Sequence, residues 1–384
     1  MANVTQDQAK PGDRSTDLLS KVAMTDDAPY DMWVETLGVP IHRGYFTDDV
    51  RKIELGWWEE RKCNAAILKL VGQEGVAESR VTEIPAGGTL PPYHFAFDEV
   101  VYVADGRGLT TVTNSDGSSS TFEWQKHSLF MLPRNTTHQL SNASGQAPAR
   151  LLHYNYLPTA MSLIPDPDFF FNSKYPTRQP GDEDAGFYSE AKIIAREDSR
   201  TAYWLGNFFP DMRAWDRLAP FRGRGAGGHV VWIRFPGSAM TNHMSVFPSR
   251  TYKKGHRHGP GVMIVIPAGE GYSVMWPEGG EKVIVPWSEG AVFVPPNQWY
   301  HQHFNLGGAP ARYLAFHSPR AVDSENSRID ETLATRQQIE YPSEEREVRQ
   351  RFEAELAKRG LTSLMPEEAY KDPTYEWEYE GKSA

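Results

Sequence analysis

Three histidines form the pattern in this chain that is most able to do chemistry. His256 and His258 alternate around Arg257, and His301 follows further along the chain. Because successive side chains of a β-strand point to opposite faces, His256 and His258 share a face while Arg257 points away. His301 must then arrive from a neighbouring strand. Since neutral imidazoles are common metal ligands, the pattern predicts one mononuclear metal site made of these three histidines.

Three protein ligands leave positions open on the metal, which is typical of catalytic sites. Three imidazoles suit Fe(II), Zn(II), Cu(II), Ni(II) or Mn(II), and affinity alone favours copper or zinc, so the ligand set does not identify the metal. A centre without a carboxylate ligand is more positive. It therefore favours an anionic, bidentate substrate such as an enolate, a catecholate or a hydroxy acid.

Side chains next to the histidines are candidates for proton transfer and substrate binding. His303 lies two residues after His301 and so on the same face, where it is a hydrogen-bond donor near the metal, an acid/base or itself a ligand. In a regular strand Tyr252 and Lys254 also face inward. A buried Lys254 would face a substrate carboxylate or enolate, and Tyr252 would act as a general acid/base. Alternatively, the strand bends at Gly255 and both reach solvent.

Apolar residues near the histidines predict a mostly apolar cavity with a few polar anchors. The expected lining is Val262, Ile264, Val274, Trp276 and Phe293, with Trp299 and Phe304 at the mouth or behind the ligands. Packing alone is the simpler role for any one of them. Such a cavity would fit a planar aromatic or enolised substrate better than a sugar.

The elements that must position these residues are short strands. Residues 261–268 and 291–294 are apolar runs, and residues 269–271 form a glycine-rich turn between strands. The whole pattern occurs twice at a constant offset of 163 residues, which indicates a duplicated barrel. The offset aligns Glu99 with Val262, Gly106 with Gly269, Gly108 with Gly271, Gly117 with Gly280, Trp124 with Trp287, Phe130 with Phe293, Pro133 with Pro296, His138 with His301 and Asn142 with Asn305.

At these residues the chain resembles the cupin superfamily, whose two motifs are a His-x-His segment followed by a glutamate and a Pro-x-Gly-x-x-His-x-x-x-Asn segment. The second motif is present at full spacing as Pro296, Gln298 at the glycine place, His301 and Asn305. The first departs from the family pattern, because Arg250 replaces its opening glycine and Val262 its glutamate. The resemblance therefore implies a site of three histidines without the usual fourth ligand.

The first copy lacks the His-x-His pair. At the constant offset Tyr93 and Phe95 take those places, so His94, Glu99 and His138 are the only ligand candidates there. A shift of the strand by one residue would be needed to bring His94 inward. A packed first barrel that stabilises a metal-binding second one is the simpler interpretation.

The resemblance to bicupins covers roughly residues 55–320 and implies an all-β chain of two tandem cupin barrels (double-stranded β-helix or jelly roll). The expected organisation is a disordered leader (1–28), an arm (29–58) that crosses onto the other barrel or a partner subunit, a first barrel with a degenerate metal site (59–158), a connector (159–227), a second barrel with the metal site (228–320) and a helical or irregular tail (321–384).

Cupins with three histidines commonly hold Fe(II) and activate dioxygen, so the resemblance implies an Fe(II) dioxygenase that cleaves a C–C bond of a small aromatic, enolic or hydroxy-acid substrate. The alternative is a non-oxidative lyase, isomerase or hydrolase with Zn, Mn or Ni and a tyrosine or histidine acid/base. A binding or storage protein is a third interpretation. Oxalate decarboxylation is not expected, because bicupins known for it keep four ligands in both barrels.

The composition of the chain limits the classes of partner that it is expected to bind. A net charge of -10 and a pI near 5.7 argue against nucleic acid. Cys63 alone excludes an intramolecular disulfide, and the sequence has no long apolar run and no secretory leader. We expect a cytoplasmic protein without membrane contact, acting on a small molecule and O2. By analogy with other cupins we expect a homodimer.

Overall fold

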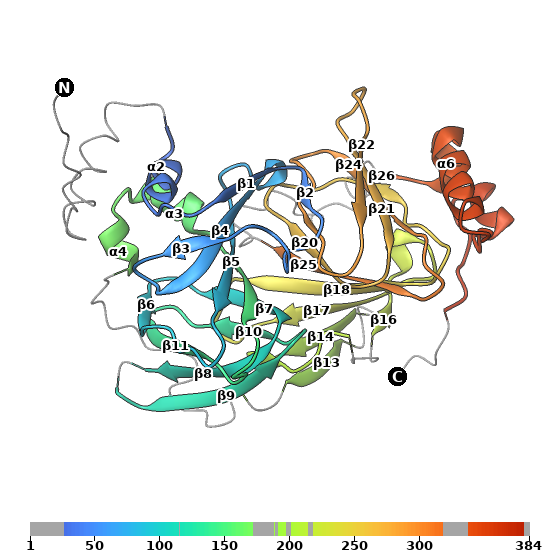
Figure 1. Ribbon diagram of the computed structural model, residues 1–384. Coiled ribbons are helices and arrows are strands. Elements are labelled where there is room, and N and C mark those ends of the chain that lie inside the picture. The colour runs from blue at the N-terminus through green and yellow to red at the C-terminus, as the bar shows by residue number, and fades with distance from the viewer. Residues whose placement is uncertain are drawn as a thin grey trace, which may run out of the picture.

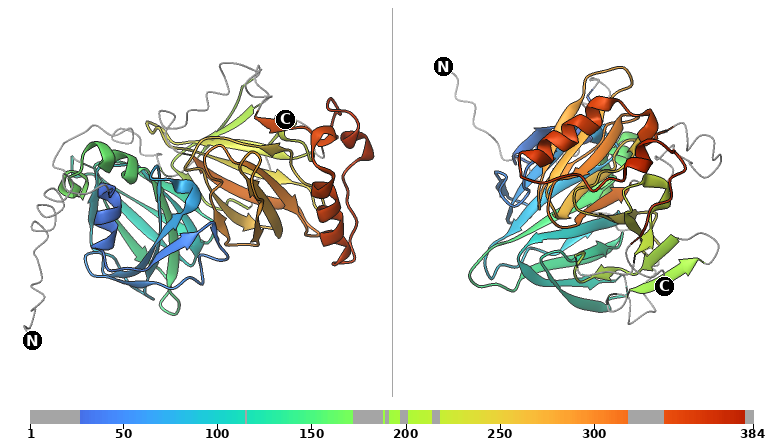
Figure 2. Two further views of the ribbon diagram at one scale, coloured as in Figure 1. Left: turned by 90° about the horizontal axis from the view of Figure 1, so that it is seen from above. Right: turned by 90° about the vertical axis from the view of Figure 1, so that its right-hand side faces the viewer.

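The computed structural model describes residues 27–114, 116–171, 188, 191–196, 201–213, 218–317 and 337–379. Within these residues the chain forms two β-barrels that lie side by side (Figures 1 and 2). The predicted leader, 1–28, lies almost entirely outside them. Each barrel consists of a large and a small sheet, and neighbouring strands are mostly antiparallel.

The first barrel has a large sheet of order β1-β4-β5-β12-β7-β10-β15, with β3 beside β4, and a small sheet of order β6-β11-β8-β9. The strands of the large sheet are β1 (Ile41–Gly44), β3 (Gly56–Trp58), β4 (Cys63–Leu70), β5 (Glu78–Ile84), β7 (Glu99–Asp105), β10 (Leu129–Leu132), β12 (Ala149–Asn155) and β15 (Phe208–Phe209). Those of the small sheet are β6 (Tyr93–Phe95), β8 (Arg107–Thr113), β9 (Ser119–Gln125) and β11 (Thr136–Asn142).

The second barrel repeats this plan. Its large sheet has the order β13-β14-β17-β18-β25-β20-β23-β2, with β16 beside β17, and its small sheet the order β22-β21-β24-β19-β26. The large sheet contains β2 (Phe46–Thr47), β13 (Lys192–Arg196), β14 (Thr201–Leu205), β16 (Ala219–Pro220), β17 (His229–Arg234), β18 (Thr241–Phe247), β20 (Met263–Ala268), β23 (Val292–Phe293) and β25 (Ala311–His317). The small sheet contains β19 (Gly255–His256), β21 (Gly271–Trp276), β22 (Val283–Trp287), β24 (Tyr300–Asn305) and β26 (Gln338–Ile339).

Helices cover the ends of the molecule. They are α2 (Pro29–Glu35), α3 (Leu157–Leu163), α4 (Pro167–Phe171) and α6 (Arg346–Ala357), with short 3-10 turns η1 (Val71–Gln73), η2 (Arg222–Arg224), η3 (Tyr341–Ser343) and η4 (Glu367–Tyr370). In the described parts of the chain, none of the helices is both long and apolar enough to cross a membrane.

Asn142 and Asn305, which the offset of 163 residues relates, make the same hydrogen bonds in the two barrels. Asn142 donates to the backbone oxygens of Ile84, Pro85 and Ala147, and Asn305 donates in the same way to Phe247, Pro248 and Ala309. Each asparagine thus ties the end of one strand to the turns beside it. A Cβ on Gly271 would lie 1.9 Å from the backbone oxygen of Phe304 and 2.7 Å from Trp287, so this close approach admits only glycine.

The duplication extends into the arms that precede each barrel, and the arms are exchanged. Strand β2, from the N-terminal arm, pairs with β23 of the second barrel, and β15, from the connector, pairs with β10 of the first. Beyond these strands the amide of Val50 donates to Gly290 and that of Met212 to His127. Of the two destinations predicted for the N-terminal arm, the structure shows the other barrel.

The large sheets of the two barrels share one apolar core. Its fully buried members include Val100 and Met131 from the first barrel and Val231 and Met244 from the second. Separate clusters fill the interior of each barrel. The barrels are therefore joined by a continuous buried layer, which stabilises both in proportion to the apolar area removed from water.

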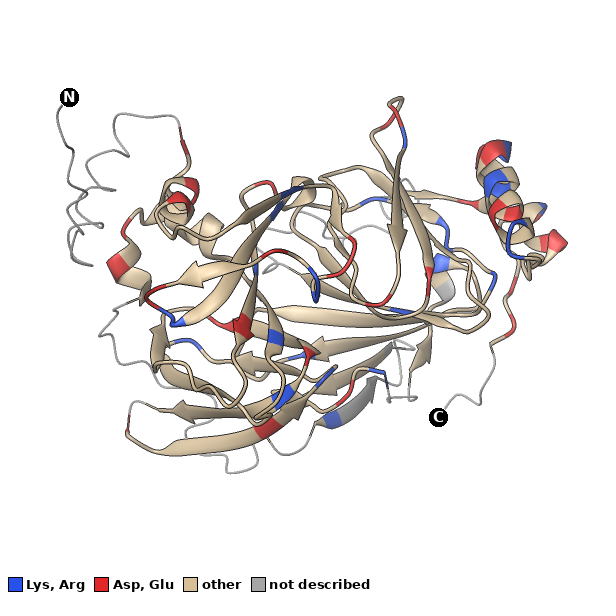
Figure 3. Cartoon of the chain, viewed as in Figure 1, with Lys and Arg blue, Asp and Glu red and all other residues tan. Residues whose placement is uncertain are grey.

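The predicted helix of the tail is α6, which lies against the outer face of the small sheet of the second barrel (Figure 2). Val348, Phe352 and Leu356 are its buried residues and pack with Phe304 and Tyr252. Charges of both signs line the rest of this helix (Figure 3). Before it, β26 pairs with β19, so the tail adds a strand beside His256.

Candidate metal centre

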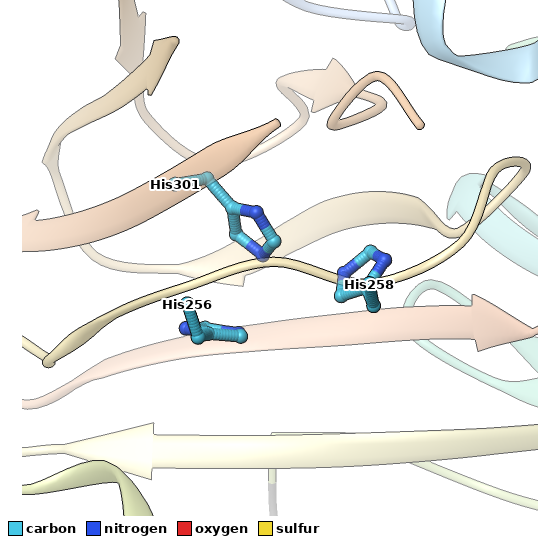
Figure 4. A group of neighbouring side chains, drawn as sticks. All are labelled: His256, His258 and His301. Atoms are coloured by element: carbon cyan, nitrogen blue, oxygen red, sulfur yellow. The ribbon is translucent and has the colours of Figure 1, made fainter. Parts of the chain in front are cut away.

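The structure brings His256, His258 and His301 together inside the second barrel. Each offers one ring nitrogen, and these atoms lie within 4.8 Å of one another. His256 and His301 are directly paired across β19 and β24, while His258 comes from the loop that follows β19. Figure 4 shows the three rings turned toward one another.

Hydrogen bonds to the backbone fix which nitrogen of each ring is available. Nδ1 of His256 lies 3.1 Å from the oxygen of Lys254, that of His258 2.9 Å from Gly259, and that of His301 3.2 Å from Trp299. A carbonyl oxygen only accepts, so each Nδ1 carries the proton and the lone pair of each ring lies on Nε2. Such outer hydrogen bonds orient metal-binding imidazoles.

The surroundings keep these rings in the neutral form that binds metal. Burial lowers the pKa of His256 well below its usual range, and Arg224 and the neighbouring imidazoles lower it further. Burial has the same effect on His301, followed by His258 and His303. Nε2 of His301 is buried with no hydrogen-bond partner among the described residues. A buried nitrogen without a hydrogen-bond partner is consistent with a metal ligand.

His303 is beside the triad but outside it. Its ring centre lies 5.5 Å from that of His301 and 6.2 Å from that of His256. Trp287 donates to the hydroxyl of Ser273, which leaves that hydroxyl free to donate to Nδ1 of His303 at 2.8 Å. Burial, with the Lys253 charge next, lowers the pKa of His303 to about 3. His303 is therefore a neutral imidazole whose Nε2 carries the ring proton and can donate a hydrogen bond.

The strand before His256 is irregular, and this moves two predicted site residues away from the triad. Tyr252 bridges to Phe304, whereas His256 pairs with His301, so one extra residue lies between the two pairs. A bulge of this kind reverses the alternation of side chains. The Tyr252 hydroxyl donates to Glu344 and Lys254 forms an ion pair with Glu340, both in the tail. The expectation that these two side chains enter the barrel is not met.

Lys253 points into the barrel instead. It is fully buried, and its Nζ donates to the hydroxyls of Ser245 and Tyr313, the latter at 3.2 Å. No carboxylate forms an ion pair with it among the residues that the structure describes. Burial lowers the pKa of Lys253 well below its usual range, and the Arg224 charge adds to this effect.

The interior is more polar than predicted. Nδ1 of His243 and Nε2 of His317 are 2.7 Å apart, and both residues lie on strands that face into the barrel. Of the predicted apolar lining, Val262, Ile264 and Phe293 belong to the interior cluster. Val274, Trp276 and Phe304 face outward and pack under the tail, because they alternate with inward residues such as Ser273 and His303. Trp299 packs at the edge of the interior cluster, with Tyr45.

The first barrel positions the loops that carry the ligands. The oxygen of His258 accepts from the amide of Gln298, which ties the two ligand segments together. The amide of Gly261 donates to Gly72 of the first barrel at 2.9 Å, and the Tyr154 hydroxyl donates to the oxygen of Gly261 at 2.6 Å. Contacts across the barrel interface thus hold the loop after His258.

The first barrel has a guanidinium group, that of Arg80, at the position that corresponds to His243. Arg80 donates to Glu99 at 2.7 Å and also forms an ion pair with Glu78, and all three side chains are buried. His138 pairs across the sheet with Tyr93, so His94 lies on the opposite face. The only described cluster of three or more potential ligands is the triad of the second barrel. The residues of the first barrel do not fit a metal.

Sequence reasoning missed Lys253, His243 and His317. The constant offset was the available signal for one of them, since it aligns His243 with Arg80 of the first barrel. Alternation through the bulge indicates Tyr252 and Lys254 as the inward residues, so it gives no signal for Lys253 between them. His317 carried no signal, because it follows an ordinary apolar strand.

No family model matches the chain. An uncharacterized protein of Methanocaldococcus jannaschii is 33% identical over 87 residues, which are 22% of this chain; the chain spans 65% of that relative's length. Similar solved structures include an oxalate decarboxylase of Lactobacillus farciminis in complex with formate, with 13% identity, a TM-score of 0.46 and coverage of 72% of this chain and 86% of that one. A Bacillus subtilis oxalate decarboxylase has 12% identity, a TM-score of 0.45 and coverage of 83% of this chain and 85% of that one.

The architecture of the protein follows from its own strand pairing. Two tandem barrels, each built from a large and a small sheet and related by an internal duplication, are the architecture that the resemblance to bicupins implies. The three histidines lie together in the second barrel, and the first barrel contains an ion-pair network of Arg80 with Glu78 and Glu99.

Proposed function

We propose that the second barrel is the active site of a metal-dependent enzyme that performs non-oxidative chemistry on a small anionic substrate, as a lyase, isomerase or hydrolase. The observation that carries this proposal is the placement of His303 and Lys253 beside the triad. An imidazole whose Nε2–H can donate a hydrogen bond, and an amine or ammonium, are buried next to the place where a metal would act as Lewis acid.

The charge of the barrel interior supports an anionic substrate. Between residues 218 and 317 the carboxylates are Glu270, Glu278, Glu281 and Glu289, and each is exposed or only partly buried. Lys253 lies inside, and the Arg224 charge acts on the buried imidazoles. A bound divalent metal would add further positive charge. An anion that reaches this interior therefore gains electrostatic stabilisation that a neutral molecule does not.

Each residue has a proposed role. His256, His258 and His301 would hold the metal through Nε2, and the metal would polarise an oxygen of the substrate. Lys253 would bind the substrate's negative charge, in place of the Lys254 that the alternation rule indicated. His303, held by Ser273, would donate a hydrogen bond from Nε2 to the substrate. Tyr252 has no role in this proposal, because its hydroxyl is engaged by Glu344.

One observation favours a second candidate, the Fe(II) dioxygenase. Val262 is 3% exposed and stands where cupins commonly place the glutamate ligand, so no fourth protein ligand comes from that position. The resemblance described above links this ligand set to ferrous iron and dioxygen. The two candidates differ in whether turnover consumes oxygen.

Metal content by mass spectrometry, measured on protein purified without oxygen, is the first test. We expect about one transition metal per chain in the natural protein, almost none in His256→Ala, and an unchanged content in His42→Ala, a control in the N-terminal arm whose ring contacts the oxygen of Glu54. A full metal content in a folded His256→Ala variant would refute the site.

Turnover is tested next on hydroxy acids, keto acids and small mono- and dicarboxylates, with an oxygen electrode in the same vessel. Product formation at an unchanged rate without oxygen supports the lyase, isomerase or hydrolase. Product formation that requires iron and consumes oxygen in proportion establishes the dioxygenase instead.

A further inference from the structure

We propose that the first barrel has its own ligand site, which is metal-independent and binds a small organic monocarboxylate between Arg61 and His138. The site lies where the second barrel has its histidine triad, since His138 corresponds to His301 and Tyr93 to His256. It does not depend on the function proposed for the second barrel.

Arg61 is a buried cation without a charged partner. The side chain comes from the turn between β3 and β4, is 8% exposed, and places its guanidinium carbon 3.6 Å from the centre of the Tyr93 ring. Its guanidinium makes no hydrogen bond or ion pair with any residue that the structure describes. The contact with Tyr93 stabilises the charge but leaves the N–H donors unsatisfied, which is costly for a buried group.

His138 and Tyr93 add two more polar groups without partners. His138 is 3% exposed, its ring meets the Tyr93 ring edge-on at 5.3 Å, and neither the imidazole nor the Tyr93 hydroxyl hydrogen-bonds to a described residue. Burial lowers the pKa of His138 to about 3, with the Arg61 charge as the next cause. Three polar side chains that converge without hydrogen-bonding to one another leave their donors and acceptors available to a ligand.

The other charged groups near Arg61 are already paired with one another, and Arg61 differs from them in this respect. Arg80 is held by both Glu78 and Glu99, and Glu78 also accepts from Asn155 at 3.1 Å. Arg80 is thus occupied on two sides and unavailable to a ligand. Of the two guanidinium groups in this barrel interior, Arg61 is the one that can bind an anion.

The chemistry selects a monocarboxylate. A guanidinium fork matches the two oxygens of a planar carboxylate. A phosphate or sulfate dianion would meet one cation and would be repelled by Glu99, whose charge acts on both Arg61 and His138. The aromatic surroundings favour an apolar remainder: Tyr93 stacks on Phe95 at 5.9 Å, and Phe95 on Phe171 at 5.6 Å.

Calorimetric titration of the full chain with acetate and benzoate tests the site. The His256→Ala variant is used throughout, so that carboxylates cannot bind through a metal in the second barrel. We expect about one carboxylate per chain, an affinity at least tenfold lower when Arg61→Gln is added, and a change of less than twofold with Arg107→Gln, an exposed arginine on β8.

Arg61→Lys serves as a second variant if Arg61→Gln does not fold. It keeps a cation over Tyr93 but loses the fork, and we expect a severalfold weaker affinity for carboxylate. The proposal is overturned if neither acetate nor benzoate binds at millimolar concentration, if either Arg61 variant binds as tightly as its parent, or if sulfate or phosphate binds more tightly than the carboxylates.

Discussion

Lys253 is a buried side chain whose position costs stability, and this marks it as functional at the scale of single residues. An amine buried without a carboxylate partner is stabilised only by the hydroxyls of Ser245 and Tyr313 and by nearby rings such as that of Phe221, at 4.7 Å. Replacing unpaired buried charges by apolar groups of similar volume is often stabilising. Selection for stability alone would therefore not retain this lysine.

We predict that Lys253→Met leaves the metal content unchanged. The free energy of unfolding should stay the same or rise, by roughly 0–3 kcal/mol. The same change should lower kcat/KM for the anionic substrate at least 100-fold, because the cation that binds it is gone. Urea denaturation and steady-state kinetics measure the two effects. A clear loss of stability with normal kinetics would show that Lys253 only supports the fold.

Lys254→Met is the matched control, because Lys254 pairs with Glu340 outside the barrel. Its kinetics should match those of the natural protein. A loss of activity in this variant alone would favour the assignment made from sequence alternation over the one made from the structure.

The triad could be predicted from the sequence, and its neighbours could not, for a physical reason. His256, His258 and His301 depend on a motif whose spacing survives local irregularity. The roles of Tyr252 and Lys254 depend on an unbroken alternation, and one extra residue before His256 reverses it. The residue types in this segment do not predict that bulge. The partly polar interior followed from the same shift, since it brought Lys253 inward.

At the scale of elements, the C-terminal tail is a structural support of the metal strand. Strand β26 pairs with Gly255 and His256, and the Tyr341 hydroxyl donates to the oxygen of Tyr252 at 2.6 Å. Glu344 accepts from Tyr252 and, at 3.2 Å, from Gln302, the residue after a ligand. The helix of the tail was predictable from its charged and apolar residues. The added strand was not, because two residues carry no recognisable pattern.

Docking of the tail should depend on pH through Glu344. Burial raises the pKa of this carboxyl from 4.5 to about 7, although hydrogen bonds from Tyr252 and Gln302 oppose the shift. Because the folded pKa lies above the unfolded one, the protonated form favours folding. Its contribution is fully present below about pH 4.5 and is lost as the pH rises through about 7.

We predict that Glu344→Gln removes this dependence. The variant should exceed the natural protein in free energy of unfolding by roughly 1–3 kcal/mol at pH 8, because one pKa unit corresponds to about 1.4 kcal/mol, and the gap should narrow toward pH 5. Urea titrations between pH 5 and 8 measure it. Glu345→Gln, at an exposed neighbour, is the control, and parallel curves for all three proteins would contradict the assignment.

At the scale of the whole molecule, the two duplicated barrels differ in their interior side chains. The second barrel has the three histidines, while in the first barrel Arg80 is neutralised by its two carboxylates, so the interior charge is balanced within the protein. The exchanged strands β2 and β15 and the shared apolar core join the barrels. The two-barrel plan was predictable from the repeat, but the exchange of arms was not, since strands of two residues can pair with either barrel.

This organisation predicts that a change in the first barrel weakens metal binding in the second. A Cβ on Gly72 would lie 2.4 Å from the oxygen of Val294 and 2.7 Å from Pro295, directly before the segment that carries His301. Both contacts are with backbone atoms, so the loop must move. The amide of Gly261, which donates to Gly72, would move with it.

We therefore expect Gly72→Ala to lower the free energy of unfolding by about 1–3 kcal/mol, as overpacking does, and to weaken metal affinity at least tenfold. Competition with a chromogenic chelator measures the affinity, and denaturation measures the stability. Gly145→Ala is the control, because a Cβ there meets nothing within 4 Å. Unchanged metal affinity in a destabilised Gly72→Ala protein would show that the barrels share a core but not the positioning of the ligands. A tenfold loss would establish that the metal-free barrel holds the geometry of the metal-binding one.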